Sequence, residues 1–429
     1  MSDVFADLEK RGLLHQSTDA QQLAGWLAKG CRTVYVGFDP TADSLHVGSL
    51  LPLMTLRRFQ RAGHRPISLV GGATGMIGDP SGKSQERNLL SEEMLQANLA
   101  GIEQQLRSFL DFDCGECSAL LVNNWEWMKE FSYLGFLRDV GKHFPVNAML
   151  AKDSVKHRLE RDDVGISYTE FSYMLLQAYD FVHLHQQYDC GLQFGGSDQW
   201  GNITAGIDLA RRLCSAHLFG LTCPLLTKSD GSKMGKTESG TIWLSADRTS
   251  PYQFYQYWIN VADDDVGKCL RFLTDLSLEE IGALDEARQA RPEKRESQRK
   301  LAEALTQLVH GSEQLGVAQK ATEFFFGAEI ADMRDEQLSD VFADVPSQQV
   351  PAADLGGGGM GLIDALSTAG LVQSKGEARR VIKEGGAYIN NRRCTDIAAR
   401  LTSTDLASET MVVLRRGKKR YALLQFVDS

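Results

Sequence analysis

The sequence predicts an α/β protein: a parallel-sheet domain comes first, followed by an α-helical domain and then by a small α+β domain. Residues 31–39, CRTVYVGFD, are typical of a short buried strand that ends in a glycine-containing turn. An amphipathic helix is expected over about 44–62, and a second apolar strand over 66–70. A strand, a helix and a strand within about 40 residues form a βαβ unit, which indicates a parallel sheet with ligands at its carboxyl edge.

The remaining segments extend this pattern along the chain. Residues from about 85 to 180 and from about 250 to 326 have helical periodicity, and 189–195 are typical of a returning strand. Residues 346–360 contain two prolines and four consecutive glycines, so we expect a flexible linker there. The expected parts are a parallel-sheet domain over 1–247 with a helical insertion near 125–170, a helical domain over 248–345, this linker, and a small domain over 361–429.

The tail beyond the linker combines a helix with strands. Ser374-Lys375-Gly376-Glu377 is a capping box, which predicts that a helix begins there. Strands are expected over 387–390, 410–414 and 421–426, and the last two flank a basic turn at 415–420. The tail is therefore expected to be a compact α+β module.

Charge is divided unevenly between this tail and the rest of the chain. The 429 residues carry 46 Lys+Arg and 56 Asp+Glu, a net charge of −10, which taken alone argues against a nucleic-acid partner. Residues 355–429 nevertheless carry a net charge of +5, whereas the preceding 354 residues carry −15. The overall acidity hides a basic module, which suits a polyanionic partner.

The sequence carries no signal for a membrane or for secretion. No segment has the length and apolarity of a transmembrane helix, and residues 1–12 lack the apolar core of a secretory leader. We therefore expect a cytoplasmic protein with reduced thiols. Cys114 and Cys117 form a C-x-x-C pair, but no second pair completes a zinc site, so a solvent-side turn is the favoured interpretation.

A glycine-rich run follows the second predicted strand. Residues 71–78 lack the spacing of the dinucleotide fingerprint. Only three residues separate Gly78 from Gly82-Lys83-Ser84, whereas a P-loop has four between its first glycine and this motif. An NAD enzyme and a P-loop NTPase are therefore disfavoured. Asp79 could hold an amino group, and Lys83 and Arg87 could contact phosphates; the alternative is a simple tight turn.

The first predicted helix begins directly after a strand. Its free N–H groups and the positive end of its dipole make that end an anion site. Thr41 and His46 would add donors there, and Gly48 would let a flat base approach the backbone. The alternative is an ordinary helix with Asp43 or Ser44 as N-cap, which leaves the histidine and the glycine unexplained.

Two other segments carry polar groups in a regular spacing. Tyr173, Gln177 and Asp180 share one helix face, which suits a small zwitterion with a polar tip. The alternative, a solvent-facing polar stripe, fits poorly with the apolar residues on either side. Lys233 and Lys236 lie in a glycine-hinged loop, which suits a mobile clamp on polyphosphate, although exposed loops are often rich in lysine and glycine.

A pair of glycines closes the returning strand. Asp198 follows Gly195-Gly196 and could accept hydrogen bonds from both hydroxyls of a ribose. The alternative is a glycine turn in which Asp198 caps the next helix.

Taken together, these segments resemble the bacterial-type tyrosyl-tRNA synthetases, which are class I aminoacyl-tRNA synthetases. In chain order they are YVGFDPTADSLHVG, GGATGMIGDPSGKS, FSYMLLQAYD, GGSDQWGN and KMGKT. HVGS at 46–49 corresponds to the HIGH signature of that class, and KMGKT at 233–237 to its KMSKS signature. The resemblance covers nearly the whole chain and implies a Rossmann-like catalytic domain, a helical domain and an α-L type RNA-binding tail.

The resemblance implies a two-step reaction. L-tyrosine and ATP, the latter with Mg²⁺ as its substrate complex, would give tyrosyl-adenylate and pyrophosphate. The tyrosyl group would then pass to the 3′-terminal adenosine of a tRNA. No prosthetic group and no resident metal site are implied. The family also implies a homodimer, with residues of about 130–168 at the interface.

The resemblance also implies roles for individual residues. The tyrosine site would comprise Tyr35 and Asp180 at the phenolic hydroxyl, Asp79, Tyr173 and Gln177 at the amino group, and Gln199 near the carboxylate. ATP would be bound by Asp39, Gly48, Ser49, Gly196, Asp198 and Lys236. The catalytic residues, at the γ-phosphate and pyrophosphate, would be Thr41, His46, Lys83, Arg87, Lys233, Lys236 and Thr237. The expected RNA-binding residues are Lys375, Arg379, Arg380, Lys383, Arg415, Arg416, Lys418 and Lys419.

Two alternatives to a tyrosine–tRNA ligase stay open, and the first rests on one departure from the signature. Ser49 stands where the class has its second histidine, and this favours a non-catalytic RNA-binding paralogue; the intact Lys233 and Lys236 argue against it. A second alternative is a ligase for another amino acid, such as tryptophan. Tyr35 with Asp180 favours a phenol over an indole.

Overall fold

The computed structural model describes residues 3–81, 91–152, 155–156, 159, 165–237, 240–325, 327–330, 333–343, 345–418 and 420–428. The chain divides into two compact units. The first contains residues 1–249 and 259–305, and the second contains residues 250–258 and 306–429. Among the helices of the described ranges, none is long and apolar enough to cross a membrane.

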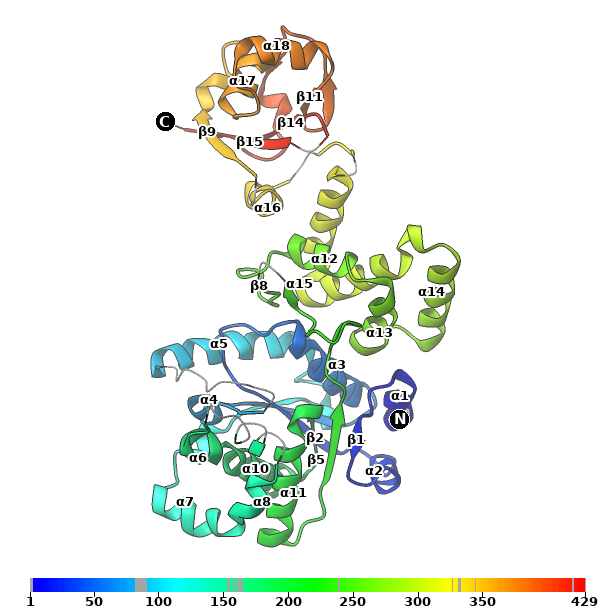
Figure 1. Ribbon diagram of the computed structural model, residues 1–429, viewed down its shortest axis with the longest axis vertical. Coiled ribbons are helices and arrows are strands. Elements are labelled where there is room, and N and C mark those ends of the chain that lie inside the picture. Colours follow the sequence, from blue (N-terminus) through cyan, green and yellow to red (C-terminus); the bar gives the residue numbers. More distant parts are fainter. Residues whose placement is uncertain are drawn as a thin grey trace. The chain divides into compact units, whose positions relative to one another are not determined.

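A six-stranded sheet forms the centre of the first unit (Figure 1). Its strands, in spatial order, are β1 (Gln16–Ser17), β6 (Phe219–Cys223), β5 (Cys190–Gly196), β2 (Thr33–Phe38), β3 (Arg65–Val70) and β4 (Leu120–Asn123). All neighbours are parallel except β1, which is antiparallel to β6. The predictions of a parallel sheet and of strands β2, β3 and β5 are confirmed.

Helices cover both faces of this sheet. Figure 1 shows α3 (Val47–Arg61) and α5 (Glu92–Phe109) on one side, and α10 (Tyr168–Tyr188) and α11 (Trp200–Cys214) on the other. Phe59 of α3 packs on Phe194 with ring centroids 5.6 Å apart, whereas Phe181 of α10 packs on Tyr35 at 5.3 Å. Both faces of the strands are thus buried, which is why their sequences are continuously apolar.

The long segment predicted to be mostly helical contains a strand. Residues 120–123, LLVN, form the edge strand β4, which pairs with β3. A run of four residues is too short to show strand periodicity against its helical surroundings. Short helices follow in the region predicted as a helical insertion: α6 (Trp125–Met128), α7 (Tyr133–Asp139) and α8 (Val146–Leu150). The N-terminus adds α1 (Val4–Arg11) and α2 (Ala20–Leu27).

The region predicted as a helical domain is helical, but it is shared between the two units. Its helices are α12 (Pro251–Ile259), α13 (Asp263–Leu273), α14 (Leu278–Ala290), α15 (Glu296–Phe325) and α16 (Asp335–Val341). Gly311 interrupts α15 with a non-helical φ of 85° and ψ of 169°. In the second unit Phe324 of α15 and Phe342 pack against Val413 and Leu423 of the C-terminal sheet, which joins this end of α15 to the tail.

The tail of the second unit is a five-stranded sheet with two helices. The strand order is β12 (Arg392–Cys394), β11 (Ala387–Ile389), β14 (Met411–Arg416), β15 (Arg420–Val427) and β9 (Ser347–Pro351). Helices α17 (Leu362–Thr368) and α18 (Lys375–Lys383) share a core with the sheet. Ser374 caps α18 by accepting from the Glu377 N–H, so the predicted helix start is confirmed. The Glu377 carboxylate accepts from the Gln373 N–H and not from that of Ser374, so the capping box itself is incomplete.

The prediction of a flexible linker over 346–360 is wrong for its first half. Residues 347–351 form β9, which pairs in parallel with β15, and Val350 is buried in the C-terminal core. Two of the four glycines also have a distant partner, because Arg400 donates to the carbonyl oxygens of Gly358 and Gly359. The order of this segment depends on residues about 40–75 positions later in the chain, which local composition does not reveal.

Candidate functional site

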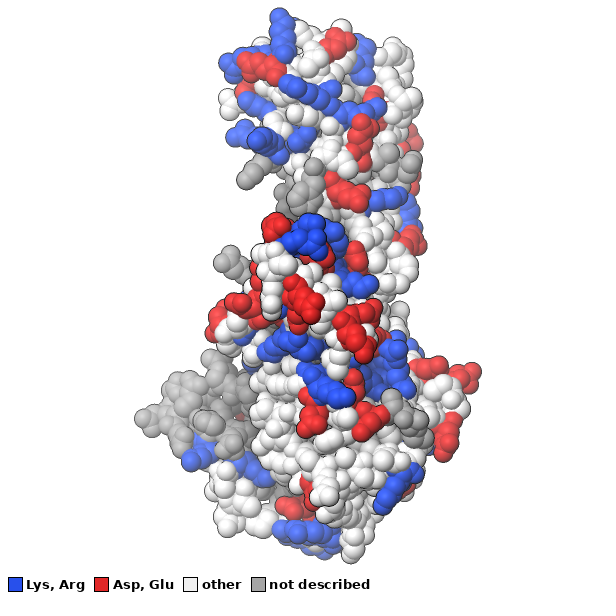
Figure 2. Space-filling view, turned by 90° about the vertical axis from the view of Figure 1, so that its right-hand side faces the viewer, with Lys and Arg blue, Asp and Glu red and all other residues white. Residues whose placement is uncertain are grey.

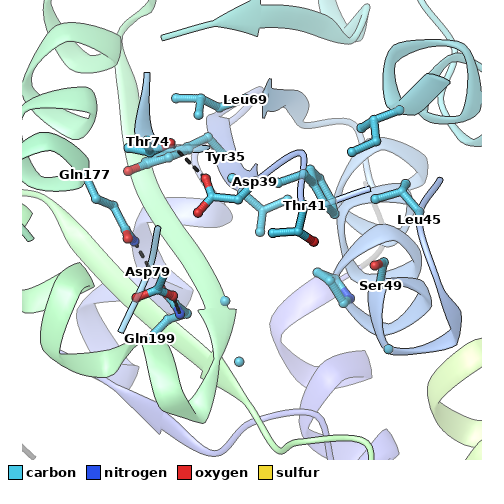
Figure 3. Close-up of a pocket in the computed structure, with 18 of the residues that line it drawn as sticks. Tyr35, Asp39, Thr41, Leu45, Ser49, Leu69, Thr74, Asp79, Gln177 and Gln199 are labelled. Carbon is cyan, nitrogen blue, oxygen red and sulfur yellow. Dashed lines mark hydrogen bonds between the residues drawn. The ribbon is translucent and has the colours of Figure 1, made fainter. Parts of the chain in front are cut away.

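A cavity of about 290 Å³ opens at the carboxyl ends of β2 and β5 (Figure 3). All six residues predicted to bind tyrosine line it, as do Thr41, His46, Asp39, Gly48, Ser49 and Gly196. Parallel strands end at the same edge, so side chains that follow different strands converge there. The structure therefore brings together residues from 35 to 199 that the motifs singled out separately.

Asp79 anchors a polar network on one wall of this cavity. The amide of Gln199 donates to Asp79 Oδ2 over 2.7 Å, and the amide of Gln177 donates to Gln199 Oε1 over 3.3 Å (Figure 3). Asn202, from the next turn of α11, donates to Gln199 Oε1 over 3.2 Å. Asp79 also accepts from the Ser81 N–H at 2.9 Å. The carboxylate is thereby held in place as a buried acceptor facing the cavity.

Asp39 forms a second polar centre. Thr74 Oγ1 donates to Asp39 Oδ1, and Tyr173 Oη donates to Asp39 Oδ2, both over 2.8 Å. Burial, and next the charge of Asp39, raise the pKa of Tyr173 well above its ordinary value, so this phenol stays a donor. Tyr173, predicted at the substrate amino group, is thus hydrogen-bonded to Asp39, which is predicted at the nucleotide.

Asp180 lies at the closed, buried end of the cavity. Trp127 Nε1 donates to Asp180 Oδ1 over 2.9 Å, and Asn124 Nδ2 donates to Asp180 Oδ2 over 3.0 Å. Burial raises the pKa of Asp180 to about 7, although these two hydrogen bonds oppose the shift. Only 2% of Asp180 is exposed, so its carboxyl is a buried acceptor on the floor of the site.

Tyr35 lines the same end of the cavity from β2. It is 1% exposed, and its hydroxyl has no hydrogen-bond partner among the described residues. Burial, and next the charge of Asp180, raise the pKa of the Tyr35 phenol. A buried polar group without a partner is costly unless a ligand supplies one. This end of the cavity therefore suits a ligand that carries a hydroxyl.

His46 begins helix α3 and caps it. Its Nδ1 accepts from the Gly48 N–H over 3.0 Å, so His46, and not Asp43 or Ser44, is the N-cap. A Cβ at Gly48 would lie 2.7 Å from the imidazole ring, so the glycine makes room for the histidine. Ser49 Oγ accepts from the His46 N–H at a long 3.5 Å, which completes a capping box.

The KMGKT segment leads into a hairpin next to this helix start, with Met234 and Gly235 buried and the lysines exposed. Lys236 and Thr237 form β7, which pairs with β8 (Gly240–Thr241). The Val47 N–H donates to Ile242 O over 3.0 Å, and the Leu244 N–H to Leu45 O over 2.8 Å. Ile242 in turn donates from its N–H to Gly235 O over 2.9 Å, so the residues that follow KMGKT connect the two signature segments through backbone hydrogen bonds. Lys233, Lys236 and Thr237 themselves are exposed and do not line the cavity.

Several predicted residues lie elsewhere. Lys83, Arg87 and Lys419 fall outside the described residues. Asp198 is half-buried next to the lining residue Gly196 but does not itself line the cavity. Among the described ranges, no group of three or more His, Cys, Asp or Glu side chains could hold a metal ion.

The predicted RNA-binding residues divide into two groups. Lys375 pairs with Asp364 at 2.7 Å, and Arg416 pairs with Glu377 at 2.8 Å and also donates to Leu371 O. The guanidinium of Arg415 lies 3.8 Å from the centroid of the Tyr388 ring. Arg379, Arg380, Lys383 and Lys418 are exposed, and Lys375 is exposed as well despite its ion pair. Figure 2 shows Lys and Arg side chains gathered on the second unit, in the upper part of the view.

Comparison with known proteins gives the family. The family model described as tRNA synthetases class I (W and Y) matches residues 29–327, and that of the tyrosine–tRNA ligase SYY-like C-terminal domain matches residues 337–424. The chain is 58% identical to a tyrosine–tRNA ligase of Rhodopirellula baltica, with 100% of this chain and 97% of the relative covered. It is 50% identical to that of Geobacillus stearothermophilus, with 99% and 100% covered.

Solved structures agree with these relatives. A C-terminally truncated mitochondrial tyrosyl-tRNA synthetase of Aspergillus nidulans superposes with a TM-score of 0.68 at 32% identity, covering 75% of this chain and 94% of that one. A tryptophanyl-tRNA synthetase of Encephalitozoon cuniculi, at 15% identity and a TM-score of 0.53, shares the fold. The chain therefore belongs to the bacterial-type tyrosyl-tRNA synthetases of class I.

Proposed function

We propose that the cavity binds L-tyrosine and ATP for the tyrosine–tRNA ligase reaction. The chain is a class I aminoacyl-tRNA synthetase, and its relatives at 50–58% identity over nearly their whole length are named tyrosine–tRNA ligases. These names favour the ligase over the non-catalytic paralogue. The observation that carries the proposal for the site is the unpartnered Tyr35 hydroxyl at the end of the cavity that holds Asp180.

The substrate phenol would bind between Tyr35 and Asp180. Its hydroxyl would donate to the Asp180 carboxylate and accept from Tyr35, which satisfies both buried groups at once. Phenylalanine would leave them unpaired and desolvated, and this enzyme family is already a known case of rejection by this route. The indole of tryptophan offers a donor but no acceptor for Tyr35.

The α-amino group would bind on the opposite side of the cavity. Asp79 supplies the charge, while Tyr173 and Gln177 supply further oxygen atoms. Gln199, whose amide donates to Asp79, would lie near the substrate carboxylate. The hydrogen bonds among these side chains hold them in position before the substrate arrives, so little ordering remains to be done on binding.

In the activation step, an oxygen of the tyrosine carboxylate attacks the α-phosphorus of ATP. A bond forms between this oxygen and phosphorus, the bond to the bridging oxygen of the β-phosphate breaks, and pyrophosphate leaves. The carboxylate is already a nucleophile, so no general base is required. The residues that would stabilise the developing charge are Thr41 and His46 at the γ-phosphate and Lys83, Arg87, Lys233, Lys236 and Thr237 at the pyrophosphate.

The nucleotide would bind along the strand ends. Asp39, Gly48, Ser49, Gly196 and Asp198 would contact ATP, with Asp198 on the ribose, and Mg²⁺ would arrive with ATP as part of the substrate. Lys236 would reach the phosphates from its exposed hairpin. The tyrosyl group would then pass from the adenylate to the terminal adenosine of tRNA. This reaction supplies translation, and we therefore infer a cytoplasmic location.

Tyrosine-dependent ATP–pyrophosphate exchange tests the proposal. Exchange should occur with tyrosine and fall by several orders of magnitude with phenylalanine and tryptophan. Exchange that peaks with another amino acid would overturn the assignment of the pocket. If no amino acid supports exchange, the result would favour the non-catalytic RNA-binding paralogue.

The tRNA would contact the exposed cations of α18 and of the basic turn between β14 and β15. Replacing Arg379, Arg380 and Lys383 together by alanine should lower kcat/KM for tRNA charging and make its salt dependence shallower. Pyrophosphate exchange should not change. Lys320→Ala, an exposed lysine of the same unit, is the control. Substitution is preferable to truncation after Pro351, because that truncation would leave β9 without its partner β15.

Exposed apolar side chains support a homodimer. Tyr133, Leu134, Val146, Leu150 and Tyr168 are 41–75% exposed, all in the segment where the family predicts the interface. Leu134→Glu should shift the protein from dimer to monomer in sedimentation equilibrium. Leu213→Glu, at a comparably apolar exposed position of α11, should not. A monomer before substitution would exclude the dimer.

A further inference from the structure

Three cysteines gather at the amino edge of the parallel sheet. Cys31 directly precedes the β2 region, and Cys114 and Cys117 form the C-x-x-C pair that precedes β4. Cys117 Sγ lies 4.0 Å from Cys31 Sγ, 86 residues away in the sequence. Cys114 Sγ instead accepts from Gln60 Nε2 at 3.6 Å. The thiol of Cys117 therefore contacts Cys31, which lies outside the C-x-x-C motif, and not Cys114 within it.

The surroundings of this thiol pair allow a closer approach. Both sulfur atoms belong to half-exposed residues without a disulfide. Cys31 follows Gly30, and Cys117 ends the short 3₁₀ helix η1 (Gly115–Cys117). Neither cysteine lies in a paired strand, so their backbones can move without breaking the sheet ladder. A disulfide requires a sulfur separation of about 2.05 Å, so the two loops need to close by roughly 2 Å.

We propose that Cys31 and Cys117 are an oxidant-sensitive pair, which hydrogen peroxide converts into an intramolecular disulfide. One thiolate attacks the peroxide, forming an S–O bond while the O–O bond breaks and water leaves, and gives a sulfenic acid. The second thiolate then attacks this sulfur, an S–S bond forms, and the oxygen leaves as a second water. Two thiols are oxidised and one peroxide is reduced to two waters.

The protonation state of Cys31 sets the pace of this reaction. Burial, and next the neighbouring Cys117, raise the pKa of the Cys31 thiol to about 11. Because the thiolate is the reactive form, oxidation should be slow at neutral pH and accelerate as the pH rises.

The position of the pair predicts the effect of oxidation. The disulfide would join the loop before β2 to the loop before β4 and would span the start of β3, the strand between them. Arg65 at that start already donates to Glu116 O over 3.1 Å and connects the same loops. The tyrosine cavity lies at the opposite, carboxyl edge of the strands. Oxidation should therefore raise thermal stability, because it closes a long loop, and leave the pyrophosphate exchange rate unchanged.

Peptide mapping of the full chain tests the proposal. The protein is treated with hydrogen peroxide, and its remaining thiols are alkylated before digestion. Trypsin releases Cys31 within Gly30-Cys31-Arg32. A second digestion with a glutamate-specific protease cleaves after Glu116 and separates Cys114 from Cys117. The expected product links that tripeptide to the fragment with Cys117 and is reversed by a thiol reductant.

Variants sharpen the assignment. Cys114→Ser and the control Cys394→Ser should still form the disulfide and show the rise in melting temperature, while Cys31→Ser and Cys117→Ser should show neither. A bond between Cys114 and Cys117, oxidation to sulfinic or sulfonic acid without a disulfide, or unmodified thiols would each overturn the proposal. The map of the unsubstituted chain decides the matter even if a variant folds poorly.

Discussion

Trp127 donates a hydrogen bond from its indole nitrogen to Asp180 Oδ1 over 2.9 Å. The carboxylate at the closed end of the cavity thus depends on a neighbour that no motif indicated. Trp127 is 9% exposed and also stacks on His183 with ring centroids 4.2 Å apart, so its orientation is determined by packing. Its hydrogen bond favours the charged form of Asp180, the form that accepts from a phenol.

Trp127→Phe should weaken selection for tyrosine. The substitution keeps an aromatic ring but removes the donor, and a hydrogen bond to a charged group contributes about 1.5–3 kcal/mol. We expect kcat/KM for tyrosine in pyrophosphate exchange to fall by roughly tenfold or more, and kcat/KM for phenylalanine to fall less. Trp125→Phe, at the more exposed tryptophan of the same segment, is the control. Equal losses for both amino acids would show that Trp127 acts through folding alone.

The pH dependence of tyrosine use should report the ionisation of Asp180. Burial raises the pKa of this carboxyl from 3.8 to about 7, so the acceptor form is present above about pH 7 and is lost below it. We expect kcat/KM for tyrosine to rise with pH through this range. Trp127→Phe should move the inflection to higher pH, because it removes a group that lowers the pKa. If the substitution leaves the inflection at the same pH, the inflection does not report the ionisation of Asp180.

The same shift has the opposite consequence for stability. A carboxyl whose pKa is raised on folding favours the folded state most below its ordinary value of 3.8, and this contribution is lost as the pH rises through about 7. Asp180→Asn removes the ionisation. Its melting temperature relative to the unsubstituted protein should therefore increase between pH 4 and pH 8, and a constant difference would contradict the assignment.

His46 combines a structural and a proposed catalytic role, which two substitutions can separate. His46→Ala removes both the N-cap of α3 and the imidazole, and should cost about 1 kcal/mol of unfolding free energy together with most of the pyrophosphate exchange. His46→Asn offers a side-chain oxygen that can accept from the Gly48 N–H. It should recover stability in urea denaturation but not exchange. If His46→Asn also recovers pyrophosphate exchange, His46 acts only as the N-cap of α3 and has no catalytic role.

The motifs predicted the cavity well because each is local. Asp39 directly follows β2, Gln199 comes three residues after β5 and Asp79 nine residues after β3, and parallel strands bring such positions to one edge. Trp127 and Asn124 could not be found in this way, because their contacts with Asp180 span 53 and 56 residues. Asn202 lay within a recognised segment. Its hydrogen bonds to Gln199 and Asp79 depend on the direction that α11 takes after β5, which the motif does not specify.

The C-terminal boundary shows the opposite case, in which local composition misleads. Prolines and glycines in 346–360 favour a mobile chain when they are considered alone. Pairing of β9 with β15 outweighs that tendency, and Val350 adds a buried apolar side chain at an otherwise exposed edge strand. Proline at 351 is tolerated because it ends an edge strand, where one missing donor leaves no central ladder broken.

Gly235 in KMGKT differs from the serine of the class signature, and its surroundings explain the difference. Its φ is 85°, and a Cβ would lie 2.7 Å from Val47 Cβ in the HVGS segment. Gly235→Ala should therefore displace the hairpin that carries Lys233 and Lys236, and lower the rate of pyrophosphate exchange with little change in tyrosine binding. Gly231→Ala is the matched control, because Gly231 has a φ of 83° but nothing within 4 Å of its Cβ position. Both variants share the backbone cost of about 1–2 kcal/mol, so the larger loss expected for Gly235→Ala measures the contact with Val47. Equal losses would mean that the two signature segments act independently.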